Sequence, residues 1–261
     1  MTLGILQEMT IDQVRAFRPR VVVIGVGSVE PHGPVLPYGT DYFQCDAVVR
    51  RATVQANRRK ARVLMYPTLP IGNNANFRAF PFACRIGVQT LTQVALDILH
   101  ALEEDGIRKI VLFNGHGGNT DALRVALRAH IGSDKPGRRA FACMASYGGE
   151  ARFVEHPSDH GGESEVSQMM HLRPDLVRRE KFGVFPRGRL AVEALADGDV
   201  YFVRPWHLYV PASAGGDVRK AGAAKGLGLI DSAARRLAQL LVQLAQSRWT
   251  PTFPYQPSGR K

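Results

Sequence analysis

Short apolar runs that alternate with helical segments constrain the fold of this chain most. The run 21–27 (VVVIGVG) is β-branched and almost continuous, which is typical of a buried parallel strand. Further strand-like runs follow at 62–66, 107–113 and 140–147, and helical apolar spacing covers 88–105 and 121–131. Strand, helix and strand in alternation predict right-handed βαβ units. We therefore expect an α/β fold with a mostly parallel sheet and helices on both faces.

The second half of the chain carries weaker patterns. Its spacing predicts a short helix over 162–171 and a long last helix over 220–246. The run 200–210 is strand-like but is interrupted by Pro205. The Pro-rich tail is expected to be extended. Because 261 residues suit one α/β unit and no linker is present, we expect a single domain over 1–261, with the tail beginning at about residue 248.

Composition excludes several protein classes. Apolar residues make up 45% of the chain and charged residues 22%, as in ordinary globular proteins. The first residues lack the pattern of a signal peptide, and no window reaches the roughly 18 uninterrupted apolar residues of a membrane span. Three cysteines without a CxxC pair indicate neither a disulfide framework nor a zinc ribbon. A soluble cytoplasmic protein without a membrane partner is expected.

The net charge of +11 raises the alternative of a metal-free nucleic-acid-binding module. The basic residues are spread along the chain, however, and their small clusters lack the interleaved aromatic residues of a single-strand-binding surface. We therefore expect a solvated basic surface and no nucleic-acid partner, while attraction of an anionic substrate stays open.

The first polar motif follows the first strand and reads GSVEPHGPVLPYGTD over 27–41. It offers Glu30, His32 and Asp41, with Gly and Pro residues holding an irregular backbone between them. Glu30 and His32 would project to the same side of an extended segment and could serve one or two cations. The alternative is a surface loop with common polar residues.

The second motif, NGHGGNTD over 114–121, follows the strand at 107–113. Three glycines around His116 let the backbone approach a ligand closely and leave the imidazole unshielded at the start of the next helix. A phosphate-binding loop is the rival explanation, but neither GxxxxGK[ST] nor GxGxxG is present.

The third motif, EHPSDHGGESEVS over 155–167, follows the strand at 140–147. Glu165 falls slightly more than one helical turn beyond His160, so both could face one crevice. A capped helix start is the alternative, and it would explain Asp159 as the cap but not His160 with its two glycines.

The three motifs together indicate one composite site at the carboxyl ends of parallel strands. Carboxylates mixed with imidazoles suit Zn²⁺, Mn²⁺ or Fe²⁺, and five such ligands exceed the needs of one tetrahedral ion. Two divalent metal ions per chain sharing a bridging carboxylate are therefore expected. Such a centre activates water for attack on a carbonyl group, so hydrolysis is the implied reaction.

On these motifs, together with Phe80-Pro81 and the late Gly216, Asp217, Ala221, Lys225 and Gly226, the chain resembles the creatininase (creatinine amidohydrolase) family across nearly its whole length. The resemblance implies a three-layer α/β/α sandwich, often assembled as a hexamer. It implies that Glu30, His32, Asp41 and His116 are metal ligands, with Asp41 bridging the ions. It also implies that His160, paired with Asp159, moves protons during catalysis.

The chain departs from the creatinine-hydrolysing members at several positions. They carry a metal-binding glutamate two residues after the histidine of the second motif, where this chain has Gly118. We expect Glu165 to supply the missing ligand, with Glu163 as the second choice. The tryptophans that line the creatinine pocket have no match near His156, so creatinine itself is not the expected substrate.

Where many relatives carry a Ser-x-Glu-His loop, this chain has polar residues that we expect to bind substrate: Asn73, Asn74, Asn76 and Arg78. Their donors favour a polar substrate, although asparagines also make turns.

The expected function is therefore amidohydrolase-type C–N cleavage of a small, polar, cyclic molecule. The alternative is hydrolytic C–C ring opening of a cyclic diketone such as 3-dehydro-scyllo-inosose. A homo-oligomer, hexamer before dimer, is also expected, with aromatic contact residues at Trp206, Tyr209, Trp249, Phe253 and Tyr255.

Overall fold

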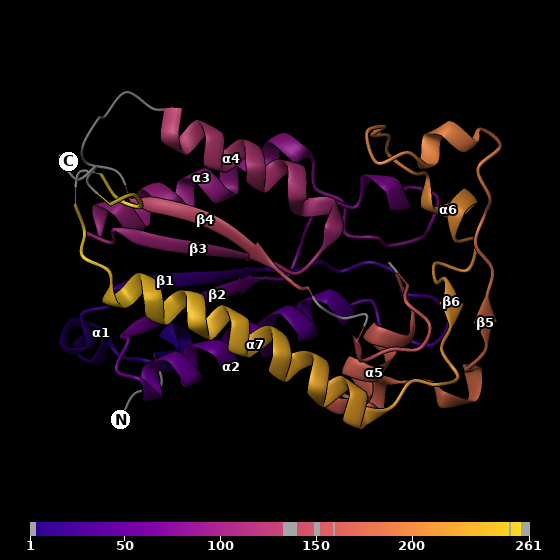
Figure 1. Ribbon diagram of the computed structural model, residues 1–261, viewed down its shortest axis with the longest axis horizontal. Helices are drawn as coiled ribbons and strands as arrows, with labels where there is room; N and C mark the ends of the chain where they lie inside the picture. Colours follow the sequence, from indigo (N-terminus) through magenta and orange to yellow (C-terminus); the bar gives the residue numbers. More distant parts are fainter. Residues whose placement is uncertain (1–3, 133–139, 149–151, 159, 251, 257–261) are drawn as a thin grey trace.

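The computed structural model describes residues 4–132, 140–148, 152–158, 160–250 and 252–256. Its central sheet has the strand order β2-β1-β3-β4, and every neighbouring pair is parallel (Figure 1). The strands of this sheet are β1 (Val21–Val26), β2 (Val63–Leu69), β3 (Lys109–Asn114) and β4 (Phe141–Ser146). A separate antiparallel pair is formed by β5 (Val184–Phe185) and β6 (Gly216–Asp217).

Helices cover both faces of the sheet, which confirms the predicted three-layer α/β/α sandwich (Figure 1). One face carries α3 (Val88–Glu104) and α4 (Thr120–Gly132). The other carries α2 (Thr40–Arg58) and α7 (Ala223–Gln246). The remaining helices are α1 (Ile11–Phe17), α5 (Glu163–Leu172) and the single turn α6 (Trp206–Tyr209).

The continuous apolar run of β1 reflects burial on both sides. Val21 and Val23 pack with α2 and α7, whereas Val22 and Ile24 pack with α3 and α4. Side chains of a strand alternate between the faces of a sheet, so a strand covered twice needs apolar residues at every position. All six residues of β1 are buried.

Two local predictions are wrong. Residues 200–205 form no strand, and the segment turns into α6 directly after Pro205, whose ring removes a ladder donor. Within the tail, residues 252–256 turn rather than extend, since the backbone N–H of Tyr255 donates to the carbonyl of Thr252. The sequence analysis also missed α2, whose first turn holds Asp41 of the first motif.

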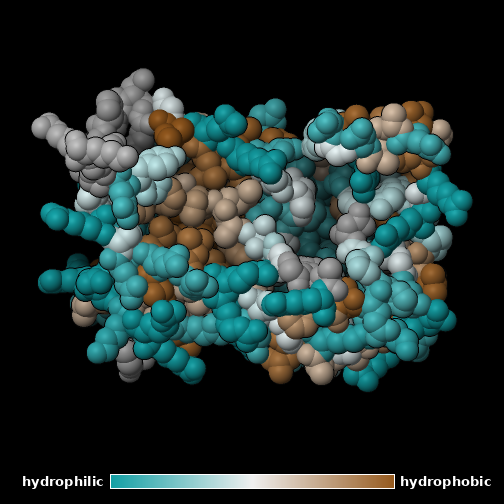
Figure 2. Space-filling view, viewed as in Figure 1, coloured by the Kyte–Doolittle hydropathy of each residue, from teal (hydrophilic) through white to brown (hydrophobic). Residues whose placement is uncertain are grey.

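The carboxyl ends of β1, β3 and β4 open into one cleft of ≈ 1010 Å³. Figure 2 shows the hollow, lined mainly by hydrophilic side chains, between the sheet and the part of the chain that carries α6. No helix of the described residues is long and apolar enough to cross a membrane.

Candidate metal centre

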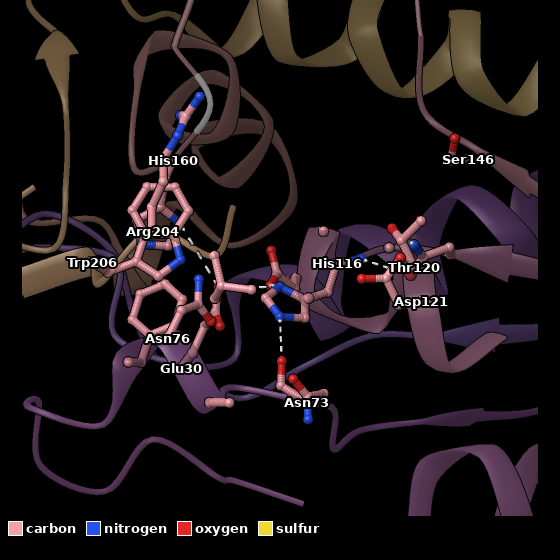
Figure 3. Close-up of a pocket in the computed structure, with 18 of the residues that line it drawn as sticks. Glu30, Asn73, Asn76, His116, Thr120, Asp121, Ser146, His160, Arg204 and Trp206 are labelled. Atoms are coloured by element: carbon pink, nitrogen blue, oxygen red, sulfur yellow. Dashed lines mark hydrogen bonds and ion pairs between the residues drawn. The ribbon is translucent and has the colours of Figure 1, made fainter. Parts of the chain in front are cut away.

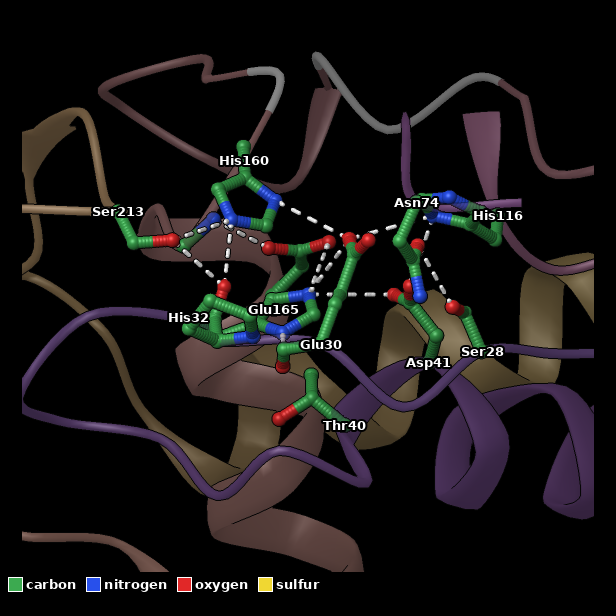
Figure 4. Close-up of polar contacts among 12 residues, drawn as sticks. Ser28, Glu30, His32, Thr40, Asp41, Asn74, His116, His160, Glu165 and Ser213 are labelled. Carbon is green, nitrogen blue, oxygen red and sulfur yellow. Dashed lines mark hydrogen bonds and ion pairs between the residues drawn. The ribbon is translucent and has the colours of Figure 1, made fainter. Parts of the chain in front are cut away.

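Six histidines and carboxylates from distant segments meet at the floor of the cleft (Figure 4). The loop after β1 supplies Glu30 and His32, and the first turn of α2 supplies Asp41. The others are His116 after β3, His160 before α5, and Glu165 in the first turn of α5. All are buried except Glu165, whose side chain is 19% exposed. Asp159, predicted as the partner of His160, lies outside the described residues.

The cluster contains two sets of three donors that share Asp41. In one set, His116 Nδ1 lies 3.2 Å from Glu30 Oε1 and 3.0 Å from Asp41 Oδ2. In the other, His32 Nε2 lies 3.2 Å from Asp41 Oδ1 and 3.8 Å from Glu165 Oε1. Within each set the donor atoms lie within 4.8 Å of one another. This spacing fits a pair of cations bridged by the Asp41 carboxylate.

The three imidazoles are oriented by backbone carbonyls. His32 Nδ1 lies 3.0 Å from the carbonyl oxygen of Glu30 and His116 Nε2 3.0 Å from that of Asn73. His160 Nε2 lies 2.9 Å from the carbonyl oxygen of Pro31. Since a carbonyl can only accept, each of these nitrogens carries a hydrogen, and the opposite nitrogen of each ring faces the carboxylates. Metal-binding histidines are held in the same way.

Three buried atoms at the centre of the cluster have no hydrogen-bond partner among the described residues. They are Glu30 Oε2, His32 Nε2 and Asp41 Oδ2. Buried carboxylate oxygens without donors are costly, because burial removes their hydration. Divalent cations would supply the missing charge and the missing partners. The donor set therefore fits the metal pair that the motifs predict.

Burial and mutual charge set the protonation of the cluster. Burial raises the pKa of Glu30. Burial also opposes charge on His32, but Asp41, Glu165 and Glu30 outweigh it and raise its pKa to about 10. His116 follows the same pattern beside Glu30 and Asp41, and its pKa is also raised. Despite burial, the two imidazoles lower the pKa of Asp41. In the absence of cations, protons on histidine would thus balance the carboxylates.

His160 differs from the other two histidines. Burial and the charge of His32 hold its pKa well below the ordinary value. Its Nδ1 lies 3.7 Å from Glu30 Oε1, and its ring centroid lies 4.3 Å from that of His32. Ser213 Oγ donates to the same Pro31 carbonyl at 2.7 Å. This environment favours a neutral imidazole whose Nδ1 faces the Glu30 carboxylate.

The two glutamates of the third motif have separate environments, although they are two residues apart. Glu165 faces His32, and its Oε2 accepts from the backbone N–H of Gly161 at 2.5 Å. Glu163 is fully buried and pairs with Lys225 Nζ at 2.6 Å. Its other oxygen accepts from the backbone N–H groups of residues 155 and 156. Glu163 therefore anchors a loop to α7, and Glu165 is the glutamate available to a cation.

The backbone at Gly118 has no room for a side chain. A Cβ atom built there would collide with the carbonyl oxygen of Asn73 and with Nε2 of His116. A glutamate cannot reach the metal centre from this position without moving His116. The structure thus gives a steric reason for glycine at position 118.

The four residues predicted to bind substrate lie in different places. Asn74 is fully buried, accepts from Ser28 and donates to backbone carbonyls, so it holds loops together. Asn73 lines the cleft but donates its side chain to the carbonyl of Ile86. Asn76 lines the cleft. Arg78 is exposed and is not among the cleft-lining residues.

The sequence analysis missed one wall of the cleft. Residues 195–198, 200–204 and Trp206 line this wall, and Tyr201 ties it to α4 by donating its hydroxyl hydrogen to Asp121 Oδ2 at 2.7 Å. Trp206 stacks on Phe77, with ring centroids 5.5 Å apart, and lies 5.2 Å from His160 (Figure 3). Sequence analysis placed Trp206 among the contact residues of an oligomer, and no sequence pattern predicted its position in the cleft.

A second group of possible metal ligands, which we call the α3–α4 cluster, contains His100, Glu103 and His130. Here the backbone of Ala140 forms hydrogen bonds with two of the three side chains. Its N–H donates to Glu103 Oε1 at 2.5 Å, and its carbonyl oxygen lies 3.0 Å from His130 Nε2. This cluster fastens the entry of β4 to the two helices, and a structural role explains it.

Comparisons with known proteins identify the family of this chain. The family model described as creatinine amidohydrolase, Creatininase, matches residues 7–241. The chain belongs to the creatininase family. It is therefore a creatininase-family hydrolase, as the motifs predicted.

The relatives within the creatininase family differ in the substrates that their names give. A mycofactocin precursor peptide peptidase from Mycobacterium tuberculosis is 30% identical over 98% of this chain and 94% of its own length. A creatinine amidohydrolase from Pseudomonas putida is 28% identical over 60% of this chain and 66% of its own. A 3-dehydro-scyllo-inosose hydrolase from Thermotoga maritima is 26% identical over 42% of this chain and 35% of its own.

Solved structures share the fold over nearly the whole chain. A creatininase-family protein from Bacteroides fragilis has a TM-score of 0.83 and 27% identity over 96% of this chain and 100% of its own. A creatininase in a manganese form has a TM-score of 0.71 and 22% identity, covering 94% of this chain and 99% of its own. A creatininase mutant of the Zn–Zn type has a TM-score of 0.72, also at 22% identity, over 95% of this chain and 100% of its own.

Proposed function

We propose that this chain is a binuclear metal-dependent amidohydrolase that cleaves the C–N bond of a peptide-like amide. The observation that carries the proposal is the pair of buried donor sets that share Asp41 at the floor of the cleft. Glu30, Asp41 and His116 would hold one cation, and His32, Asp41 and Glu165 would hold the other. Zn²⁺, Mn²⁺ and Fe²⁺ suit such mixed carboxylate and imidazole ligands.

When bound, the two ions would lower the pKa of a water molecule and stabilise negative charge on the carbonyl oxygen of the amide. The protein's own residues would then manage orientation and protons. His160 holds a hydrogen on Nε2 against the Pro31 carbonyl, so its Nδ1 would take up the proton that the attacking water loses and deliver it to the departing amine. The amine needs this proton because an amide anion is a poor leaving group. Ser213 and Pro31 keep the imidazole in this orientation.

The size of the cleft supports a peptide-like substrate rather than a compact ring. At ≈ 1010 Å³ it lies at the upper end of the range of about 300–1,000 Å³ that is common for small-molecule sites. It extends from the metal centre to Arg124 on α4 and to residues 195–204. The peptidase relative that matches 98% of the chain points the same way. We therefore replace the small cyclic substrate expected from sequence with an extended one.

The proposal can be tested by assaying metal-loaded protein for hydrolysis of three substrate groups: short peptides, creatinine, and cyclic diketones derived from inositol. We expect hydrolysis of peptides, measured as release of new amino groups, and its loss after exhaustive chelation. Readdition of Zn²⁺ or Mn²⁺ should restore it. A chelated, metal-free preparation with full activity would exclude a metal mechanism.

Hydrolytic C–C cleavage is the second candidate, because the polar wall at Asn76 also suits a hydroxyl-rich ring and one relative is a 3-dehydro-scyllo-inosose hydrolase. Here too His160 would deliver the proton, in this case to an enolate carbon. Ring opening of the diketone without peptide hydrolysis would favour this candidate over the first.

A further inference from the structure

Helix α5 presents three different sides to its surroundings. Toward α7, Glu163 pairs with Lys225, and the Ser167 hydroxyl accepts from the backbone N–H of Gly222 at 3.1 Å. A second side, which includes Val166, packs into an apolar cluster. The third side lines the cleft, and two of its polar side chains are not satisfied in this way.

The cleft-lining residues of α5 are Ser164, Glu165 and Gln168, which we call the α5 strip. Residues three and four positions apart lie on the same side of a helix, so the strip is continuous. Glu165 faces His32 of the metal centre (Figure 4). Ser164 and Gln168 are each only 3% exposed, yet neither side chain has a hydrogen-bond partner among the described residues. Because nearly all buried polar groups in proteins are hydrogen-bonded, these two indicate a place for a ligand.

The neighbourhood of the α5 strip favours an uncharged ligand group. Among the described residues of α2 and α5 that line the cleft, two are the carboxylates Asp41 and Glu165, and none is a lysine or an arginine. An anionic group would therefore find no cationic side chain on these helices. Gln44 adds a second amide, held by donation to the backbone carbonyl of Glu165 at 3.2 Å. An amide side chain both donates and accepts, which matches a ligand group that does the same, such as a peptide group.

The position of Gln168 relative to Glu165 determines which peptide group it would meet. The two residues are three positions apart, which corresponds to about 4.5 Å along the helix axis. Consecutive Cα atoms of a peptide are about 3.8 Å apart. With the scissile carbonyl at the cations beside Glu165, Gln168 would therefore lie about one residue further along an extended substrate.

We propose that Gln168 is a substrate-binding residue that accepts the N–H of the peptide group next to the scissile amide, while the Ser164 hydroxyl donates to a carbonyl oxygen of the same chain. The cleft thus selects peptides over small amides that lack a second peptide group. Water can bond to these side chains in the free protein, but a ligand that displaces it must replace its hydrogen bonds. The proposal rests on the proposed amidohydrolase function and names how its substrate is recognised.

Replacing one amide N–H of a peptide by an ester oxygen removes a single donor and keeps the carbonyl group. The probes are short peptides, each paired with analogues in which one internal amide at a time is replaced by an ester. Binding to the metal-loaded protein is read in a Trp249→Phe background from the fluorescence of Trp206, which lines the cleft, whereas Trp249 packs on Phe253. Rapid mixing gives the signal before hydrolysis.

At one position along the peptide, we expect the ester to lower affinity by about tenfold, a difference of about 1.4 kcal/mol. Gln168→Met keeps the length of the side chain without its amide and should reduce this difference to less than about twofold. Ser164→Ala should instead weaken amide and ester binding alike, because both ligands keep the carbonyl oxygen. Gln243→Met, at an exposed position of α7 outside the cleft lining, should keep the full difference. Each variant should retain the metal content of the wild-type protein.

Three results would overturn the assignment of Gln168: no ester-sensitive position in the parent protein, the same ester sensitivity in Gln168→Met as in the parent, or binding of inositol-derived diketones without binding of peptides. Failure of the proposed function would look different. The ester sensitivity in binding would persist and depend on Gln168, while the metal-loaded protein would hydrolyse no peptide amide.

Discussion

The metal centre and the α3–α4 cluster are both built from histidines and carboxylates that converge from separate elements. In the α3–α4 cluster, the backbone of one residue bonds to two of the three side chains, because Ala140 offers its N–H to Glu103 Oε1 and its carbonyl to His130 Nε2. In the metal centre, backbone carbonyls hold only the outer nitrogens of the imidazoles. The inner atoms face one another, with three of them lacking any hydrogen-bond partner among the described residues. Residue type alone does not distinguish these clusters, whereas the supply of backbone partners does.

The largest effect should follow removal of the charge that both donor sets share. Asp41→Asn keeps the shape of the side chain but replaces a carboxylate by a weaker amide ligand. We expect both ions to be lost and kcat/KM to fall by more than about 100-fold, since changes to groups that merely support ligands already cost about 10- to 100-fold. Elemental analysis and the hydrolysis assay would measure this.

Asp46→Asn is the matched control, because Asp46 lies on the same helix and accepts from Thr68 outside the centre. It should keep both ions. Retention of both ions and of activity in Asp41→Asn would contradict a shared bridging role.

The next effect concerns the support of His116. In Gly118→Ala the new methyl group would displace the Asn73 carbonyl that holds His116 Nε2. We expect metal affinity to fall by about 10- to 100-fold, the usual cost of losing such support. Gly117→Ala is the control, since a Cβ at that position meets no atom within 4 Å. Equal metal affinity in the two alanine variants would show that the contact at residue 118 is unimportant.

Substitution of Glu165 and of Glu163 should have different effects, the first on metal binding and the second on stability. Glu165→Gln is expected to lose about one ion per chain and most activity, because it removes a carboxylate from the His32 set. Glu163→Gln should keep both ions but lower the melting temperature, because it leaves Lys225 with a weaker partner. Metal content and thermal unfolding measured on both variants would decide. Loss of an ion in Glu163→Gln with retention in Glu165→Gln would reverse the assignment.

Metal binding to the centre should release protons. His32, with a pKa of about 10, holds an extra proton at neutral pH in the metal-free protein, and the raised pKa of His116 favours one there too. Cations must displace these protons, so apparent affinity should rise with pH. Titration calorimetry in buffers of different ionisation enthalpy measures the release. Binding of two ions at pH 7 without proton release would contradict it.

The same shifts predict the stability of the metal-free protein. Because the folded-state pKa of His32 is raised, its contribution is complete below about pH 6.5, the ordinary value, and is lost as the pH rises toward 10. Metal-loaded protein should lose no stability from this source, since its histidines are already deprotonated. Unfolding measured across this range with and without Zn²⁺ would test the difference.

Sequence predicted the layers and the meeting of three motifs because both depend on short-range patterns. The apolar run of β1 and the positions of Glu30, His116 and Glu165 relative to strand and helix ends were enough to bring those segments together. The far wall of the cleft was not predictable, since residues 195–204 contain no regular element of more than one turn and their place depends on contacts with α4, such as that of Tyr201 with Asp121.

The loop at 73–78 shows a second limit of sequence-based prediction. Its asparagines offer the same amide groups, but Asn74 is turned inward to Ser28 and backbone carbonyls, whereas Asn76 lines the cleft. An asparagine serves either role equally well by composition. Only the path of the backbone decides between them, and no periodicity encodes it.

The smallest effect on activity should come from a change in the α3–α4 cluster, where the backbone of Ala140 already bonds to Glu103 and His130. His130→Asn removes the ring that contacts the Ala140 carbonyl and leaves a buried acceptor with a poorer partner, which should cost about 1–3 kcal/mol of unfolding free energy. Metal content and kcat/KM should stay at wild-type values, because α3, α4 and β4 contain none of the residues that we propose as metal ligands. His100→Asn is the control, since His100 is exposed and should change neither property. Denaturant unfolding, together with elemental analysis of the same preparations, measures both. If His130→Asn lowered the number of bound ions, the α3–α4 cluster would itself bind metal, and backbone satisfaction would no longer distinguish the two clusters.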